Sequence, residues 1–257
     1  MPWDFDAAVV IPTVLAVLGC NLICLIVLLA ARPAQHGAKE NAALARSVRA
    51  ALAEGIGTFV LLLACLLPMA DPLQGLVAIT AVLVVLAGAL GGHFNPAVTL
   101  GMVLAGRTGA LAGVGLVSAQ LCGAIAASAA FAAWAGLDGL TVSPHHQLPV
   151  EALGTGLLVL AVAGCTADER ARQSAPLCIG MALGAAGLFA LPHGGGTFNP
   201  ARQAVAALLT AQPGPWLACI VGPLGGAIVA GLAMRLVLEP MPPREDVRPH
   251  SEVRRAA

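Results

Sequence analysis

Long apolar stretches separated by short polar segments run along most of the chain. A helix needs about 20 apolar residues to cross the hydrocarbon core of a bilayer. Seven stretches approach or exceed that length, and we predict that each spans a membrane: residues 7–31, 50–68, 73–92, 110–135, 150–166, 176–192 and 215–238. Two shorter amphipathic segments, 96–105 and 200–211, are too short to cross.

The segments between these stretches are polar. Residues 167–175 carry four charged residues and are predicted to form a loop, and a longer loop is expected over 136–149. The tail, 239–257, is rich in proline and charge, which is typical of disordered segments.

The composition fits helices that face lipid. Hydrophobic residues make up 58% of the chain and charged residues only 10%, with a mean hydropathy of +0.88, whereas about a quarter of a soluble domain is charged. The formal net charge is zero, so nothing favours a nucleic-acid partner. The seven cysteines lie in apolar stretches without a CxxC pair or zinc-ligand spacing, so we interpret them as packing residues and expect no metal site and no cofactor.

Basic residues are distributed unequally between the two sides of the predicted topology. If the first span runs from outside to inside and the short segments re-enter, twelve of the thirteen Lys and Arg residues fall on one side, and the thirteenth, Arg202, lies in a short segment. Cytoplasmic loops carry such an excess. We therefore predict a multi-pass protein with its N-terminus outside and its C-terminus cytoplasmic. The chain has no transit-peptide character, which favours a bacterial inner (plasma) membrane.

Residues 7–31 have an alternative interpretation as a cleaved signal peptide. The segment before them, MPWDFD, is acidic rather than basic, and the apolar run is long. Both features favour a retained helix.

The chain contains an internal repeat. Residues 91–97 (GGHFNPA) and 195–201 (GGTFNPA) agree at six of seven positions, and Glu-x-x-Gly-Thr occurs at both 54–58 and 151–155. Each half has three crossings, an odd number, so the second half is inverted relative to the first. Inverted repeats place a solute pathway between the halves near the midplane.

The repeat divides the chain into three parts. Residues 1–49 are predicted to form the extra N-terminal transmembrane helix and a basic cytoplasmic linker. Residues 50–238 form the core domain, with repeats at about 50–135 and 150–238, and residues 239–257 form the disordered cytoplasmic tail.

The repeated Asn-Pro-Ala motifs are predicted to start two half-length helices, because Asn is a good N-cap and Pro suits the first helical position. Each helix has about ten residues, or about 15 Å, so helices that enter from opposite faces meet near the middle. The asparagine amides are then expected to donate to a passing solute, and the positive helix ends to repel cations and protons. An alternative is that both motifs are ordinary N-caps of short surface helices, but this would not explain why each follows the same GGxF sequence. The motif residues are Asn95, Pro96, Ala97, Asn199, Pro200 and Ala201.

These motifs resemble those of the aquaporin (major intrinsic protein) family over about residues 50–238. The resemblance rests on both NPA motifs, on Arg202 after the second one, and on the repeated Glu-x-x-Gly-Thr. It implies an all-α membrane protein with six spans and two re-entrant half-helices per protomer. It also implies one pore in each subunit of a homotetramer, passive conduction of small neutral solutes, and no enzyme activity. The helix at 7–31 departs from this plan.

The resemblance also implies roles for single residues. Glu54 and Glu151 would hold the re-entrant loops through backbone hydrogen bonds, although both could instead be interfacial charges at helix ends. His93 would support the first loop by local hydrogen bonding. Arg202 would form one wall of the outer constriction, with outward snorkelling as the alternative.

Counting from the motifs, the resemblance places the constriction at Gly75, Gly187, Gly196 and Arg202. Water-selective relatives narrow this ring with Phe and His, and glycerol facilitators use aromatic residues with a Gly. Three glycines are instead similar to the wide filter of the nodulin-like or bacterial metalloid-permeable branch, whose solutes are neutral hydroxides such as arsenous, boric or silicic acid. A water-selective aquaporin is the alternative.

Other classes of protein remain open at this point. A secondary transporter also uses inverted repeats, but it generally needs coupling groups near the midplane, and the acidic residues here lie at helix ends. No nucleophile–base set or phosphate loop indicates a membrane enzyme. A structural role with a closed pore is also possible. We interpret His145, His146 and His193 as solvated loop residues rather than metal ligands or a pH gate.

Overall fold

The computed structural model describes residues 38–136, 140, 147–167, 169–210 and 217–237. Within these ranges the regular structure is entirely helical. The elements are α2 (Ala38–Leu66), α3 (Pro72–Ala89), α4 (Pro96–Leu104), α5 (Ala110–Ala135), α6 (Leu148–Cys165), α7 (Glu169–Ala190), η2 (Leu191–His193), α8 (Pro200–Thr210), η3 (Leu217–Val221) and α9 (Gly222–Val237).

Six of the described helices are long and apolar enough to cross a membrane. They are α2, α3, α5, α6 and α7, together with α9 and the turn of π-helix, η3, that leads into it. They match the six predicted spans of the core domain. The predicted span at 7–31 and the predicted tail at 239–257 lie outside the described residues.

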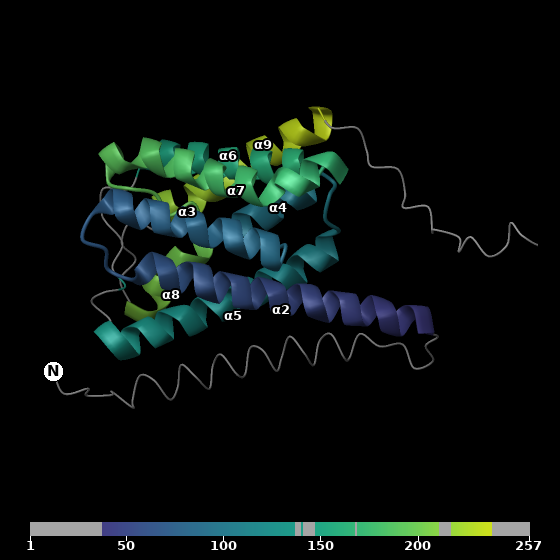
Figure 1. Cartoon of the computed structure of the whole chain (residues 1–257), viewed down its shortest axis with the longest axis horizontal. Coiled ribbons are helices and arrows are strands. Elements are labelled where there is room, and N and C mark those ends of the chain that lie inside the picture. Colours follow the sequence, from purple (N-terminus) through teal and green to yellow (C-terminus); the bar gives the residue numbers. More distant parts are fainter. Residues whose placement is uncertain (1–37, 137–139, 141–146, 168, 211–216, 238–257) are drawn as a thin grey trace, which may run out of the picture.

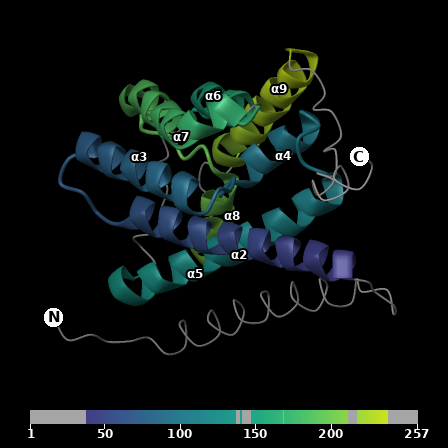
Figure 2. The same cartoon turned by 45° about the vertical axis from the view of Figure 1, so that its right-hand side comes forward.

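The long helices form two groups around the half-length helices. α2 packs along α5 on one side, whereas α6, α7 and α9 gather on the other and α3 packs against α7 (Figure 1). In the rotated view, α4 and α8 lie between these groups (Figure 2). The pair α2–α5 of the first repeat corresponds to α6–α9 of the second, as an inverted repeat requires.

Matched glycines allow the helices of each pair to approach closely. A Cβ atom on Gly123 of α5 would lie 3.1 Å from the carbonyl carbon of Gly55 in α2, and one on Gly226 of α9 would lie 2.8 Å from that of Ala152 in α6. Both distances are shorter than carbon–carbon contact allows. Small residues at such crossings permit close packing in lipid, where the hydrophobic effect does not drive helices together.

Two predicted boundaries differ from the structure. The prediction of a loop over 167–175 was wrong, because α7 begins at Glu169 and includes Pro176 in its interior. Residues 169–175 are mostly good helix formers, and the Pro176 ring packs beside Gly88 of α3, where a Cβ atom added to the glycine would be in ordinary contact with it. α2 likewise starts at Ala38, so this part of the predicted linker continues the transmembrane helix.

Candidate functional site

Each half-length helix begins at its Asn-Pro-Ala motif. Asn95 is the N-cap of α4, and its side-chain oxygen accepts from Ala97 N at 2.9 Å. Asn199 accepts from Ala201 N at 3.1 Å in the same way at the start of α8. The prolines occupy the first helical position, where their missing N–H costs nothing.

The asparagine amides link the two halves of the molecule. Asn95 Nδ2 donates to the carbonyl of Phe198 at 2.6 Å, and Asn199 Nδ2 donates to the carbonyl of Phe94 at 2.9 Å. Because an amide nitrogen carries two N–H donors, each asparagine retains a second donor for a solute. The predicted donors are therefore held in place by the opposite loop.

Phe94 and Phe198 have left-handed backbone conformations, with φ of 53° and 49°. Such a conformation is uncommon for a bulky residue and persists only where the surroundings impose it. Here the Glu54 and Glu151 carboxylates bind the N–H group of each phenylalanine, and the opposite asparagine binds its carbonyl oxygen. The strained residue thus turns its carbonyl toward the other half.

The rings of these phenylalanines fill spaces left by glycines. A Cβ on Gly57 would lie 2.9 Å from Phe94 Cζ, and one on Gly154 would lie 2.8 Å from Phe198 Cζ. Gly57 and Gly154 are the glycines of the repeated Glu-x-x-Gly-Thr motif. The motif therefore supplies both a carboxylate that binds the loop and the space in which the aromatic ring of the loop packs.

Glu54 and Glu151 are buried, with 2% and 0% of their surfaces exposed. Glu54 accepts from His93 N at 2.7 Å and Phe94 N at 2.6 Å, and Glu151 accepts from Thr197 N and Phe198 N, both at 2.7 Å. Charge-assisted bonds of this kind offset the cost of burying a carboxylate. The structure places both glutamates at the re-entrant loops.

Additional polar residues, which the sequence patterns did not identify, complete the two networks. Gln120 Nε2 donates to Glu54 at 2.8 Å and to Thr99 Oγ1 at 2.9 Å, and Thr99 Oγ1 lies 3.0 Å from His93 Nδ1. In the second half, Cys219 Sγ lies 3.7 Å from Glu151 Oε1. A glutamine inside the apolar stretch 110–135 was the available signal for the first network.

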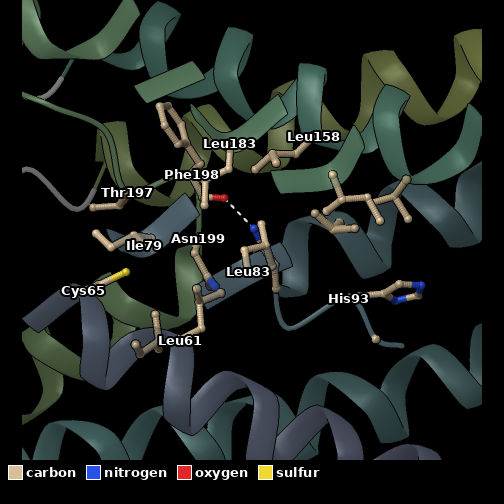
Figure 3. A pocket seen from close by; sticks show the side chains of 16 residues that line it. Leu61, Cys65, Ile79, Leu83, His93, Leu158, Leu183, Thr197, Phe198 and Asn199 are labelled. Carbon is tan, nitrogen blue, oxygen red and sulfur yellow. Dashed lines mark hydrogen bonds between the residues drawn. The ribbon is translucent and has the colours of Figure 1, made fainter. Parts of the chain in front are cut away.

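A cavity of about 50 Å³ lies where the half-helices meet. A cavity needs roughly 10–15 Å³ to hold one water molecule, so this one has room for a few water molecules. In Figure 3, Cys65, Ile79 and Thr197 gather at one end and His93 lies at the other. A vestibule of about 400 Å³, with Arg107 and Arg172 in its wall, opens beyond His93.

The cavity wall combines polar residues of the re-entrant loops with apolar side chains of the helices. The polar lining comes from the two re-entrant loops and includes His93, Asn95, Thr197 and Asn199. The apolar lining comes from the long helices and α4: Leu61, Leu62, Cys65, Ile79, Leu83, Val98, Leu158, Val162, Ile179 and Leu183.

The four predicted constriction residues do not line this cavity. Gly187 is buried against Leu76 of α3, and Gly196 faces the Phe198 ring, where an added Cβ atom would lie 2.9 Å from Phe198 Cε2. Arg202 lies in the first turn of α8, partly buried, and its Nε atom is buried without a hydrogen-bond partner among the described residues. Gly75 is also buried in α3, near Met69.

No metal site is formed by the described residues, since no three His, Cys, Asp or Glu side chains come together there. His193 is exposed at the end of η2. His145 and His146 lie outside the described residues.

Comparison with known proteins gives consistent matches over the core domain. The family described as "Major intrinsic protein" matches residues 42–234. The glycerol uptake facilitator protein-like 6 of Lactiplantibacillus plantarum is 33% identical over 213 residues, which is 74% of this chain and 98% of the relative. Aquaporin-1 of Rattus norvegicus is 36% identical over 169 residues, which is 58% of this chain and 60% of the relative.

The fold also matches a solved structure. The aquaglyceroporin from Plasmodium falciparum superposes with a TM-score of 0.58 and 20% identity, covering 74% of this chain and 96% of that one. This match confirms the predicted aquaporin-like fold for the core domain. With six helices among its described residues long and apolar enough to cross a membrane, and a family match over three quarters of its length, the chain is an integral multi-pass membrane protein and belongs to the major intrinsic protein family, whose members are channels for small neutral solutes.

Proposed function

We propose that the protein passively conducts water and uncharged polar solutes up to about the size of glycerol or urea, and excludes protons and ions. The observation that carries this proposal is the meeting of two helix N-termini at the cavity, where Asn95 and Asn199 present their amides. Helix N-termini carry a partial positive charge. Two of them at one point disfavour a cation or a hydrated proton while leaving donors for a neutral solute.

The mixed lining of the cavity supports the same selectivity. A solute that enters the cavity loses water and can replace hydrogen bonds chiefly with the groups of the re-entrant loops. Moving an ion into an apolar environment without compensation costs far more than moving a neutral hydroxyl group. The apolar part of the lining, which includes Leu83, Leu158 and Val162, therefore raises the barrier for ions much more than for a neutral solute.

The solutes are proposed to include metalloid hydroxides such as arsenous, boric or silicic acid. This part rests on the predicted ring of Gly75, Gly187, Gly196 and Arg202. Three glycines add no side chain of their own to the ring, and an arginine donates to hydroxyl oxygens. The relatives named as an aquaporin and as a glycerol facilitator-like protein support conduction of small neutral molecules more broadly.

We also propose a homotetramer in the inner membrane of a bacterium, with the vestibule on the cytoplasmic side. The vestibule wall contains Arg107 and Arg172, and basic residues accumulate on the cytoplasmic face of membrane proteins. In this orientation α2 begins on the cytoplasmic side. A membrane span at residues 7–31, placed before α2, would then start on the opposite side and put the N-terminus outside.

Stopped-flow light scattering of proteoliposomes tests the proposed transport. We expect water, glycerol, urea and boric acid to enter faster than in protein-free vesicles, and an internal pH dye to report no added proton flux. Rapid water flow without entry of the larger solutes would identify a water-selective channel. Saturable uptake coupled to an ion gradient would instead identify a secondary transporter.

A further inference from the structure

At the contact between α3 and α7, a row of α3 side chains packs against glycines of α7. Gly180, Gly184 and Gly187 of α7 face Val84, Thr80 and Leu76 of α3, so the two helices run in opposite directions. A Cβ atom on Gly184 would lie 3.2 Å from Thr80 Oγ1. One on Gly187 would lie 2.9 Å from Leu76 Cδ2 and 3.1 Å from its Cγ. Leu76 therefore occupies the space in which a side chain at position 187 would lie.

Leu76 also continues the pore-lining side of α3. Ile79 and Leu83 line the cavity, and Ile79 lies at the end marked by Cys65 and Thr197 in Figure 3. Leu76 is about one turn beyond Ile79, away from His93. At 100° per residue, Leu76 is about 40° from the mean direction of Ile79 and Leu83, whereas Gly75 is about 60° from it. The side-chain direction at Leu76 is thus closer than that at Gly75 to the side of α3 that faces the pathway.

Two other segments reach the same level of the pathway. On α7, Gly187 is one turn beyond the cavity-lining Leu183, and in the second re-entrant loop Gly196 directly precedes the cavity-lining Thr197. Gly187 has no side chain, and the side-chain direction of Gly196 points to the Phe198 ring. The half-buried Leu76 is consequently a bulky side chain at a level where these two ring positions contribute only backbone.

We propose that Leu76 is a specificity-determining residue that sets the largest solute the channel admits. Its side chain fills the space left by Gly187 and limits the width of the mouth beyond Ile79. A leucine offers no hydrogen bond, so it discriminates by size and by the cost of desolvating hydroxyl groups. This inference rests on the proposed function, because it assumes that solutes pass through the cavity.

Leu76→Ala and Leu76→Phe in proteoliposomes test the proposal, with Val77→Ala as the matched control. Val77 is adjacent in sequence but 61% exposed on the outer face of α3, so its truncation leaves the pathway unchanged. We expect Leu76→Ala to raise the ratio of glycerol to water permeability by about tenfold, equivalent to about 1.4 kcal/mol in the barrier. Leu76→Phe should lower that ratio, and Val77→Ala should leave it at the wild-type value.

The outcomes separate the inference from the proposed function. If Leu76 only packs α3 against α7, Leu76→Ala will lower the melting temperature while all variants keep the wild-type ratio, and the inference is overturned. If the wild type and all variants conduct neither water nor solute above the vesicle background, the proposed function fails, and the inference fails with it. Leu76→Phe retains a large apolar side chain, so its reduced ratio provides evidence even if Leu76→Ala folds poorly.

Discussion

Gly226→Ala adds one methyl group at the crossing of α9 and α6. The new Cβ would lie 2.8 Å from the carbonyl carbon and 3.0 Å from the Cα of Ala152, and closer still to its carbonyl oxygen. These are backbone atoms, so no side chain can rotate away. Carbon atoms pack at about 3.5–4.0 Å, and the helices must therefore move apart locally by about 0.7–1.2 Å.

The magnitude follows from two opposing effects. Overpacking a tightly packed interior costs about 1–3 kcal/mol. Replacing glycine by alanine inside a helix stabilises it by roughly 1 kcal/mol. Gly225 is the matched control, since a Cβ there meets nothing within 4 Å. Gly225→Ala therefore has only the stabilising effect of alanine in a helix. The free energies of unfolding of the two variants should differ by about 1–3 kcal/mol.

Thermal unfolding of the detergent-solubilised protein, followed by the loss of the monodisperse chromatographic peak, measures this difference. For a chain of this size, each kcal/mol shifts the melting temperature by about 2–4 °C. We expect Gly226→Ala to melt about 2–12 °C below Gly225→Ala. A Gly226→Ala protein that melts at or above Gly225→Ala would refute the close approach of α6 and α9 described above.

Three further substitutions test the site. Glu54→Gln leaves at least one buried loop N–H without its charged acceptor, so we expect a loss of about 1.5–3 kcal/mol; the same change at Glu169, whose side chain is 84% exposed, should leave the melting temperature unchanged. A cationic methanethiosulfonate coupled to Cys65, which lines the cavity, should block water flow in stopped-flow assays, and Cys65→Ser should remove that sensitivity. Asn199→Asp retains an N-cap oxygen but replaces the donor to Phe94 with a negative charge. It should raise cation flux in dye-loaded vesicles, and an unchanged flux would argue against exclusion at this point.

Local signals predicted the half-length helices almost to the residue. The expected segments 96–105 and 200–211 are Pro96–Leu104 and Pro200–Thr210 in the structure. Asparagine and proline act on the backbone next to them, so their effect is readable from adjacent residues. Pro176 shows the limit of this reasoning, because packing against α3 keeps it inside a helix that local rules would begin there.

Contacts between distant segments could not be predicted in the same way. The sequence shows Gly187 as a missing side chain, but only the structure shows that Leu76, more than a hundred residues earlier, takes that space. Gln120 presents the same difficulty, since its partner Glu54 is 66 residues away. The repeat predicts equivalent positions in the two halves, whereas these contacts depend on which side chains fill the space between them.

The crossed bonds of Asn95 and Asn199 have a consequence for synthesis of the chain. Their acceptors lie 103 and 105 residues away, in the other half. At 5–20 residues per second, the ribosome needs roughly 5–20 s to make that stretch. During this time α4 can be held only by its own half, chiefly through Glu54, which precedes its loop partners by about 40 residues. The pathway therefore cannot be completed until Phe198 and Asn199 have been made, and a chain truncated after the first half would leave the amide of Asn95 without its acceptor.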